Sequence, residues 1–600
     1  MKKVKPIAWV ILCLPVLYAA IAAAAAYKQD TNLFDLMTRF SHVLKHPTLL
    51  HWTGYTPQCI IGALACYGLA VTLYYSGYEN RRPGEEYGSA KWGSVRALNK
   101  KYADPKGKNA ILTKRISIGL DGYRHQRNLN ILVVGGSGSG KTRYFCKPGI
   151  MSANCSYLVI DPKGEMLRST GRLLEQEKYD IKVFDLIHPQ QSDGYNPFTY
   201  IRDEPDVLKL MDNLVKNTTP PKGASNDPFW EKAEIALDSA LMLYLLSEAP
   251  KEEQNFEMLM FMLECARVME EDEQYQSPLD LLFQALEERE PNHVAVREYK
   301  VYKQAAGKTA KSILISCGSR LAPFDIPQLR EIMSYDELGL DRIGDRKTAV
   351  FFTISDTTPT YNFLVALAFS QMFNLLCERA DNVHGGRLPH HVRVLWDEAA
   401  NTGQVPNLEK LVAVIRSREI SLTLFYQQMA QCKAIYDKHA ETIMGNMDSV
   451  VFLGGRESST IKEISENWLG KSTIYMQTDG RSKGQSESYN QNTQRLGREL
   501  MTPAELATMP GDRCILQLRG LPPFYSPKYD LKQHPNYKYT AEADKVKNAF
   551  SLDQLINRRR RPGLSEACEV YEADGTDTGP IGEDEDILNY DDVDDPDAYV

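Results

Sequence analysis

The stretch Asn130-Ile-Leu-Val-Val-Gly-Gly-Ser-Gly-Ser-Gly-Lys-Thr142 decides the fold. Its first part, residues 130–134, is apolar after the asparagine, which is typical of a buried strand. Residues 135–142 match the pattern G-x-x-x-x-G-K-[ST] at every fixed position, and a helix is expected from Arg143. A strand, a glycine-rich loop and a helix in this order predict a loop that binds the phosphates of a nucleotide.

Each residue type in this loop has a chemical task. The glycines let the backbone close around phosphate oxygens with its N–H groups directed inward. We therefore assign nucleotide binding to the whole loop: Gly135, Gly136, Ser137, Gly138, Ser139, Gly140, Lys141 and Thr142. Lys141 is expected to reach the β- and γ-phosphates of ATP, and the Thr142 hydroxyl is expected to ligate Mg²⁺. The alternative is a glycine–serine loop that matches by chance.

An acidic pair follows a second strand much later in the chain. The run His391–Trp396 is predicted to be that strand, and Asp397 and Glu398 stand directly after it. In an ATPase with a phosphate loop, an aspartate here holds Mg²⁺ and a glutamate activates the attacking water. The alternative is an ordinary helix cap, because acidic residues favour helix starts. Together with Lys141 and Thr142, the pair predicts a site in which Thr142 and Asp397 bind the metal and Glu398 is catalytic.

Further strand-like runs belong to the same core. They are found at Ser156–Ile160, Thr348–Ile354, Ser421–Tyr426 and Val450–Leu453. Between about residues 202 and 324 the pattern is helical instead. Alternating strands and helices predict an α/β fold with an open, mainly parallel sheet, interrupted by a helical domain. Gln427 follows one of these strands, where it either senses the γ-phosphate or is an ordinary strand-end amide.

Two long uncharged runs precede the phosphate loop. Pro6–Tyr27 and Tyr55–Tyr78 contain no Asp, Glu, Lys or Arg, and each is long enough to cross a bilayer as a helix. Basic residues outside both runs predict that both chain ends lie in the cytoplasm. A cleaved signal peptide is the alternative for the first run. In either case we expect a protein of the cell (inner) membrane, in contact with lipid, with the bulk of the chain in the cytoplasm.

The formal net charge of −8 is set by the C-terminus. After Arg561 every residue that is charged at neutral pH is acidic, fourteen in all, so the preceding chain is mildly basic. This tail is poor in apolar residues and is expected to be disordered. It is either a solubilising segment or a docking site for a basic partner. The eleven cysteines include no Cys-x-x-Cys pair, which argues against a structural zinc site.

The order of these features resembles the type IV coupling proteins, the TraG/TraD class of conjugation and type IV secretion ATPases. The resemblance covers about residues 1–530 and is carried by the two N-terminal runs, the phosphate loop, Asp161-Pro-Lys-Gly-Glu165, Asn196-Pro-Phe198, the helical insertion, Asp397-Glu398 and the strand before Gln427. It implies a RecA-like P-loop domain with an inserted all-α domain, assembled as a homohexamer. It also implies a relaxase with single-stranded DNA as the substrate, and type IV secretion channel components as partners.

The resemblance further implies that an arginine from one subunit completes the nucleotide site of the next. Arg416 stands eleven residues before Gln427, an interval that looks like the family's, and Arg418 is close enough to be the rival. Both could equally be exposed helix residues. The residues assigned to catalysis are thus Lys141, Glu398, Arg416 and Gln427.

The sequence as a whole predicts five parts. They are a membrane anchor (1–82), the first part of the ATPase domain (83–201), the inserted all-α domain (202–324), the second part of the ATPase domain (325–540) and the tail (541–600). The predicted function is a membrane-anchored ATPase that couples a DNA–relaxase substrate to a type IV secretion channel and energises conjugative DNA transfer. Two alternatives stay open: a nucleotide-switched substrate receptor that hydrolyses little ATP, and an FtsK-like DNA translocase in chromosome segregation.

Overall fold

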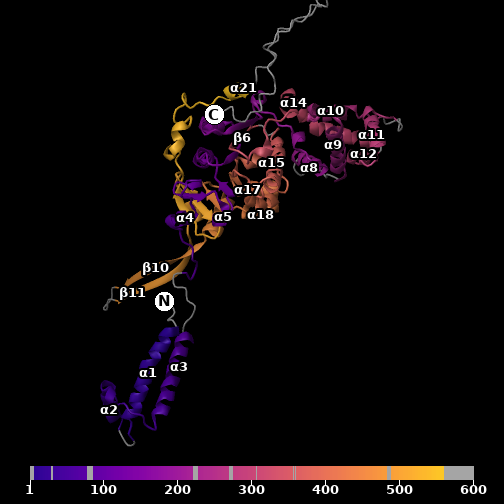
Figure 1. Ribbon diagram of the computed structural model, residues 1–600. Helices are drawn as coiled ribbons and strands as arrows, with labels where there is room; N and C mark the ends of the chain where they lie inside the picture. Colours follow the sequence, from indigo (N-terminus) through magenta and orange to yellow (C-terminus); the bar gives the residue numbers. More distant parts are fainter. Residues whose placement is uncertain are drawn as a thin grey trace, which may run out of the picture. The chain divides into compact units, whose positions relative to one another are not determined.

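The computed structural model describes residues 6–28, 32–76, 85–219, 228–268, 275–305, 307–355, 357, 360–482 and 488–559. The chain divides into two compact units, whose elements are labelled in Figure 1. The first unit comprises the N-terminal part of the chain through Lys91 together with residues 464–502. The second comprises the remaining described residues, and it contains every residue predicted for the nucleotide site.

The first unit begins with two long apolar helices, α1 (Pro6–Ala26) and α3 (Thr56–Ser76). They lie side by side and antiparallel, since the Trp9 ring contacts that of Tyr74, near the end of α3, with centroids 5.1 Å apart (Figure 1). A helix of 13 residues, α2 (Leu33–Lys45), lies in the connection between them. The two N-terminal runs that the sequence predicts to be apolar helices are therefore confirmed as helices.

Three of the described helices are long and apolar enough to cross a membrane. In α1 and α3, only 17% and 0% of the most apolar window is buried within the protein, so their side chains are available to lipid. The third, α15 (Phe363–Asn382), is 67% buried within the second unit. Its apolar composition is explained by packing against the sheet, because the Phe369 ring contacts Trp396 at 4.8 Å and Phe352 at 5.4 Å between centroids. Membrane anchoring is therefore supported for α1 and α3 alone among the described helices.

The second part of the first unit is a long antiparallel hairpin. Its strands β10 (Lys471–Ser482) and β11 (Ser488–Glu499) pair along their whole length. The base of the hairpin is bound to the segment that follows α3. There the Ala90 N–H donates to the Lys471 carbonyl and the Tyr87 N–H donates to the Thr473 hydroxyl, both at 3.0 Å. The hairpin is thus joined to the chain close to the membrane anchor.

Nine of the described strands form the central sheet of the second unit, in the order β13-β12-β9-β3-β8-β7-β4-β6-β5. The strands from β9 to β5 are parallel, and β12 and β13 extend the sheet with antiparallel pairing. Their bounds are β3 (Ile131–Val134), β4 (Ser156–Pro162), β5 (Asp180–Asp185), β6 (Thr348–Ile354), β7 (Val392–Trp396), β8 (Ile420–Tyr426), β9 (Ser449–Phe452), β12 (Arg513–Leu518) and β13 (Phe524–Pro527). This confirms the predicted α/β fold with a mainly parallel sheet.

The central strands β3, β6, β7 and β8 are buried at every residue. Strands covered on both faces have continuous apolar sequences instead of alternating ones, which is why these runs were recognisable. Short helices connect and cover the strands. They are α4 (Val95–Tyr102), α5 (Gly122–His125), α6 (Lys147–Met151), α7 (Glu165–Gln176), α16 (Leu408–Val414), α17 (Met429–Tyr436), α18 (His439–Gly445), α19 (Ser458–Glu463) and α20 (Pro503–Ala507). A small hairpin, β1 (Asn109–Thr113) with β2 (Ile116–Gly119), precedes β3.

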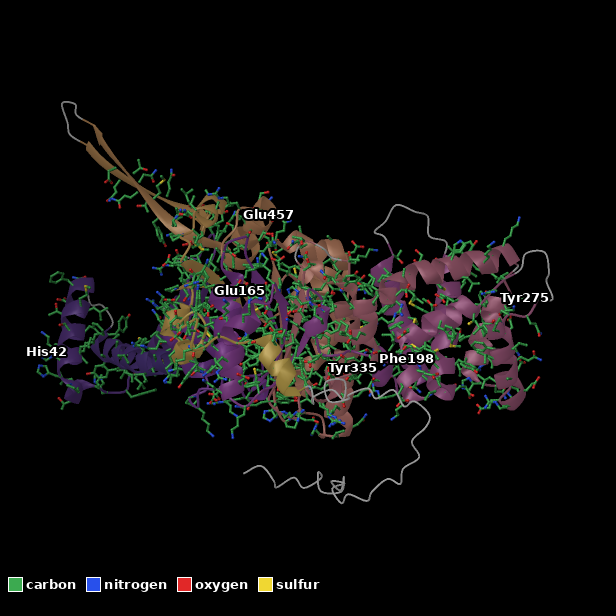
Figure 2. All side chains as sticks on the ribbon, turned by 90° about the horizontal axis from the view of Figure 1, so that it is seen from above. His42, Glu165, Phe198, Tyr275, Tyr335 and Glu457 are labelled. Carbon is green, nitrogen blue, oxygen red and sulfur yellow. The ribbon has the colours of Figure 1, made fainter. Side chains whose placement is uncertain are left out.

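Between β5 and β6, the described residues form a group of seven α-helices, seen at one end of this unit in Figure 1. They are α8 (Glu204–Thr218), α9 (Pro228–Glu248), α10 (Phe256–Cys265), α11 (Pro278–Arg289), α12 (Val294–Lys303), α13 (Gly307–Leu321) and α14 (Pro327–Ser334). Asn196 lies at the junction, where its side-chain amide donates to the carbonyls of Gln254 at 2.8 Å and Ser334 at 3.2 Å. In Figure 2, Phe198 marks this junction and Tyr275 the far end of the group.

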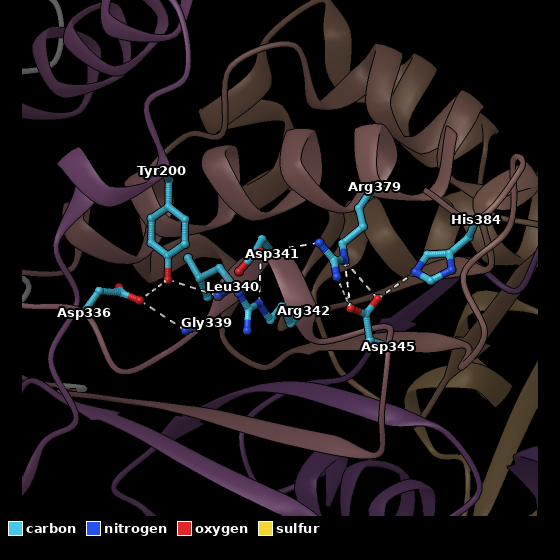
Figure 3. A network of polar contacts seen from close by, with 9 residues as sticks. All are labelled: Tyr200, Asp336, Gly339, Leu340, Asp341, Arg342, Asp345, Arg379 and His384. Carbon is cyan, nitrogen blue, oxygen red and sulfur yellow. Dashed lines mark hydrogen bonds and ion pairs between the residues drawn. The ribbon is translucent and has the colours of Figure 1, made fainter. Parts of the chain in front are cut away.

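A polar network holds the end of this helical group against α15 (Figure 3). The Tyr200 hydroxyl donates to Asp336 Oδ2 at 2.6 Å, and burial raises the pKa of Asp336 to about 6. Farther along, the Arg379 side chain of α15 donates to both carboxylate oxygens of Asp345, and His384 Nε2 lies 2.8 Å from Asp345 Oδ1. Because α15 itself packs on the sheet, the network fastens the insertion to the core. The proposed domain limits of 202 and 324 remain predictions.

The chain after β13 returns along the core and ends, among described residues, in α21 (Leu552–Arg559). Phe550, Leu552 and Leu555 pack against the buried core, and Glu542 contacts Lys147. The sequence assigned residues 541–600 to a disordered tail. The structure differs for residues 541–559, because Phe550, Leu552 and Leu555 are half-buried against the core, and we propose a tail that begins after Arg559. The acidic run itself lies outside the described residues.

Candidate nucleotide site

The parallel strands bring the predicted residues to one edge of the sheet. β3, β8 and β7 are neighbours that run in the same direction, so the residues that follow them emerge at the same edge. The phosphate loop follows β3, Gln427 follows β8, and Asp397 follows β7. The Gly135 N–H donates to the Tyr426 carbonyl at 3.1 Å, so the loop begins level with Gln427. The structure thus brings together three segments that are far apart in the sequence.

Thr142 and Asp397 are in direct contact. The Thr142 hydroxyl donates to Asp397 Oδ2 at 2.8 Å, although the two residues are 255 positions apart. Burial raises the pKa of Asp397, while the Thr142 hydrogen bond and the charge of Lys141 act in the opposite direction. A divalent cation at this pair would favour the ionised carboxylate. The pair therefore fits the predicted Mg²⁺ site.

At the candidate metal site, the residues Thr142 and Asp397 would supply only part of the coordination of a metal ion. Among the described residues, no group of three or more His, Cys, Asp or Glu side chains could hold a metal ion. Mg²⁺ is typically bound at nucleotides by one or two protein oxygens, with phosphate oxygens and water completing the octahedron. Thr142 and Asp397 supply two such oxygens. The donor set is therefore suited to Mg²⁺ that arrives with a nucleotide, and not to a resident structural metal.

The loop has a shape that requires glycine. Gly138 and Gly140 have φ angles of +73° and +83°, which side-chain-bearing residues rarely adopt. A Cβ on Gly140 would lie 2.4 Å from the Tyr144 ring, and a Cβ on Gly135 would lie 2.4 Å from the Ser139 hydroxyl oxygen. Larger residues at these positions would push into the loop itself. The glycines thus maintain a concave backbone of the size that phosphate oxygens fit.

Two polar groups of the loop indicate an anionic ligand. Lys141 is 8% exposed, and its ammonium donates across the loop to the Gly135 carbonyl at 3.1 Å. The Ser139 hydroxyl is buried without a hydrogen-bond partner among the described residues. A buried polar group without a partner is unfavourable, and phosphate oxygens accept hydrogen bonds from both ammonium and hydroxyl groups. The residues present therefore fit the phosphates of a nucleotide.

Glu398 is held in an uncommon backbone conformation beside this pair. Its φ angle is +52°, its N–H donates to Asp397 Oδ1 at 3.1 Å, and its carboxylate accepts from the Asn401 amide at 3.1 Å. Such conformations in residues other than glycine concentrate at functional sites. The side chain is half-buried, so its carboxylate remains accessible to water. The assignment of Glu398 as the base stays a prediction.

Gln427 lies at the end of β8, between the strands that lead to the phosphate loop and to Asp397. Its backbone N–H donates to Gln431 Oε1 at 2.8 Å, and its own side chain is exposed. An exposed amide at this edge is placed to meet the terminal phosphate of a bound nucleotide. Its role as a γ-phosphate sensor stays a prediction.

The two candidate arginines lie at the opposite edge of the sheet. Both belong to η9 (Ile415–Arg418), which precedes β8, whereas the phosphate loop follows β3. At about 3.3 Å per residue, the length of β8 separates the two edges by roughly 23 Å. Arg418 is bound by two nitrogens to Asp381, at 3.0 and 2.6 Å, whereas Arg416 donates once, to the Gly122 carbonyl at 3.2 Å. Neither arginine can complete the phosphate site of its own chain.

The run Asp161-Pro-Lys-Gly-Glu165 has a structural task. The buried Asp161 carboxylate accepts hydrogen bonds from the N–H groups of Met166 and Leu167, at 3.0 and 2.8 Å, and so caps the start of α7. Burial raises the pKa of Asp161 to about 7. Lys163 and Gly164 form the left-handed turn before the helix, with φ of +75° and +64°. This motif shapes the connection next to β7 and contributes no predicted ligand atom.

One residue that contacts the loop was missed by sequence reasoning. The Lys528 ammonium donates to the Ser139 carbonyl at 2.8 Å. Lys528 follows β13, a strand of four residues. A lone lysine after so short a strand carries no recognisable motif, so no signal in the sequence could have indicated its position.

Comparison with known proteins identifies the family. The family model described as type IV secretory system conjugative DNA transfer matches residues 91–553. The chain belongs to this family. The match confirms the resemblance to coupling proteins that the order of motifs indicated. A search of curated protein sequences finds no match to this chain.

Solved structures show the same fold. The bacterial conjugative coupling protein TrwBΔN70, in complex with sulphate, has 17% sequence identity and a TM-score of 0.54, covering 76% of this chain and 97% of that chain. The coupling protein TrwB in complex with ADP and Mg²⁺ gives the same values. TrwB in complex with the non-hydrolysable ATP analogue ADPNP has 16% identity, a TM-score of 0.54 and the same coverage. At these identities the likeness is one of fold.

Proposed function

We propose that this protein is a membrane-anchored ATPase that couples a relaxase and its single-stranded DNA to a type IV secretion channel during conjugation. The observation that carries the proposal is the 2.8 Å contact between Thr142 and Asp397, which joins a complete phosphate loop to an acidic strand end. Membership in the conjugative DNA transfer family supports the biological role. The TrwB structures with ADP and Mg²⁺ and with an ATP analogue support nucleotide as the ligand.

Hydrolysis would transfer the γ-phosphoryl group of ATP to water. The backbone N–H groups of residues 135–142 and the Lys141 ammonium bind the phosphates. Thr142 and Asp397 hold Mg²⁺, which when bound neutralises the charge that develops on the phosphate oxygens. Glu398 accepts a proton from the attacking water, and Gln427 contacts the terminal phosphate. Each of these tasks uses a group at the same edge of the sheet.

The position of Arg416 supports a site shared between subunits of a homohexamer. Arg416 lies at the amino edge of the sheet, away from its own phosphate loop, so it could serve only the loop of a neighbour. It is favoured over Arg418 because the Arg418 guanidinium is already paired with Asp381. An arginine supplied in this way stabilises charge in phosphoryl transfer and couples hydrolysis to assembly.

The helices α1 and α3 would anchor the protein in the cell (inner) membrane, with the bulk of the chain in the cytoplasm where ATP is available. A translocating ring grips DNA through phosphate contacts from Lys, Arg and backbone N–H groups, without reading the bases. Channel components would be met close to the membrane.

Two substitutions test this proposal in the full-length chain. Lys141→Ala is expected to abolish ATP hydrolysis and conjugative transfer while membrane fractionation stays normal. Glu398→Gln is expected to lower hydrolysis by about 100-fold or more and to stall transfer with ATP bound. Parental transfer by Glu398→Gln would favour the nucleotide-switched receptor instead. Defective chromosome partitioning with normal conjugation, after deletion, would favour the FtsK-like translocase.

A further inference from the structure

A buried lysine from the C-terminal part of the chain contacts the phosphate loop. Lys528 is 6% exposed, and its ammonium donates to the Ser139 carbonyl at 2.8 Å. The ammonium also lies 5.3 Å from the centre of the Tyr144 ring, within the range of a cation–π contact. Both partners belong to the loop or to the turn that follows it. Lys528 is thus a second buried lysine at the loop, in addition to Lys141.

Lys528 differs from Lys147, which is a third buried lysine of this region. Lys147 is 5% exposed and is paired with two carboxylates, those of Glu165 and Glu542. Lys528 forms no ion pair among the described residues. Burial lowers its pKa, an effect that Cys514 and Asp512 oppose only in part. A buried ammonium without a counter-ion is unfavourable by itself. Its position is better explained by an anion that binds at the loop than by a contribution to stability.

The peptide between Ser139 and Gly140 connects Lys528 to the interior of the loop. In a trans peptide the carbonyl and the N–H point in opposite directions. Because the Ser139 carbonyl faces Lys528, the Gly140 N–H faces away from it. Within the described part of the chain, this N–H makes no hydrogen bond. It is therefore available to a phosphate oxygen on the other side of the loop.

The sheet explains how a residue so late in the chain reaches the loop. β12 is antiparallel to β9, and β13 is antiparallel to β12, so β13 runs in the same direction as β3. Lys528 directly follows Pro527, the last residue of β13, at the edge where the loop follows β3. Its backbone N–H donates to the Asp512 carbonyl at 2.8 Å, which fixes the start of the side chain.

We propose that Lys528 is a positioning residue for the nucleotide phosphates. It holds the Ser139 carbonyl, directs the Gly140 N–H toward the phosphate, and adds positive charge behind the loop. A hydrogen bond to the carbonyl of a peptide also polarises it and strengthens its N–H as a donor. This inference deepens the proposed function and rests on it. According to this inference, β12 and β13, the last two strands in chain order, contribute to nucleotide binding because they position Lys528.

Four substitutions in the full-length, detergent-solubilised protein test the proposal. Lys528→Met removes the charge at nearly constant length, and Lys528→Arg retains it. Lys532→Met removes an exposed lysine of the same segment, and Lys147→Met removes the buried lysine that is paired. The two readouts are the Kd of a fluorescent ADP derivative in the presence of Mg²⁺ and the thermal unfolding midpoint without nucleotide.

Lys528→Met is expected to raise the Kd about tenfold or more, because a charge-assisted contact is lost, while the midpoint without nucleotide does not fall. Lys528→Arg is expected to restore at least part of the affinity, and Lys532→Met to change neither readout. Lys147→Met is expected to lower the midpoint, because it leaves two carboxylates unpaired.

Two results would overturn the assignment of Lys528 alone. One is parental ADP affinity in Lys528→Met. The other is a midpoint lowered as far as in Lys147→Met, which would make Lys528 a structural residue. If the parental protein binds no ADP, the proposed function fails and this inference fails with it. If Lys141→Ala loses ADP binding while Lys528→Met binds ADP with the parental affinity, only the inference about Lys528 is wrong and the proposed function stands.

Discussion

The two edges of the central sheet differ in how complete they are. At the carboxyl edge, the phosphate loop, Asp397 and Gln427 converge, and the Thr142–Asp397 hydrogen bond is formed within one chain. At the amino edge, Arg416 makes a single contact with a backbone carbonyl. One edge thus brings most of the candidate site together, whereas at the other edge Arg416 forms no ion pair within the described part of the chain. A ring in which one subunit's amino edge meets the next subunit's carboxyl edge would use both.

The largest effect is expected from mixing two inactive variants. Lys141→Ala and Arg416→Ala are each expected to lower ATP hydrolysis by about 1,000-fold or more. When they are mixed in equal amounts, roughly a quarter of the interfaces in a cyclic assembly would pair an intact loop with an intact arginine. Steady-state hydrolysis by the mixture is therefore expected to rise well above that of either variant.

The control for this experiment is Arg418→Ala. Because Arg418 is paired with Asp381, its loss is expected to leave hydrolysis within a few-fold of the parental rate. Recovery in mixtures with Arg418→Ala, and not with Arg416→Ala, would transfer the assignment to Arg418. No recovery with either variant would mean that the two edges do not meet.

A smaller effect is expected for Gln427→Ala, at the carboxyl edge. If the amide contacts the terminal phosphate, the variant loses affinity for a non-hydrolysable ATP analogue and retains its affinity for ADP. Its kcat is expected to fall by about tenfold or more, since the contact is made to the group that reacts. Equal losses for both nucleotides would show that Gln427 supports the loop in general and senses no phosphate.

The smallest effect is expected in the pH dependence of stability. It comes from the titration of His534, in the segment that follows Lys528. Burial lowers the pKa of His534 to about 4, whereas an unfolded histidine titrates near pH 6.5. Between these values the unfolded state binds more protons, so stability falls as the pH decreases from about 6.5 toward 4. His534→Gln is expected to reduce the difference in unfolding midpoint between pH 7.5 and pH 5.5. An unchanged difference would show that this segment does not stay packed against the end of α6, where the Asn536 side-chain amide donates to the Met151 carbonyl.

Much of the carboxyl edge could be predicted from the sequence, because its parts are short and chemically distinctive. The phosphate loop is a contiguous pattern in which the shape of the backbone demands glycine at fixed spacing. The strands before it and before Asp397 are buried on both faces, so they appear as plain apolar runs. The two N-terminal helices could be predicted for a related reason, since only long uncharged runs cross a bilayer.

Other features depend on contacts between distant segments and could not be predicted. No local pattern shows that β8 lies between β3 and β7, which sets the distance from Thr142 to Asp397. The packing of residues 541–559 was missed because a few apolar side chains in a charged stretch gain their burial only from the core that they meet. The position of Lys528 depends on two successive antiparallel pairings at the edge of the sheet.

The sequence by itself determined the chemical character of the segments: a glycine-rich loop with a lysine and a threonine, an acidic pair at a strand end, and two long uncharged runs. These follow from local patterns, because backbone conformation and solvent preference are properties of short segments. Only the tertiary structure decided which edge of the sheet each group occupies, that the two arginines lie away from their own loop, and that Lys528 stands behind it. Those facts follow from strand order and direction, which are set by the packing of the whole core.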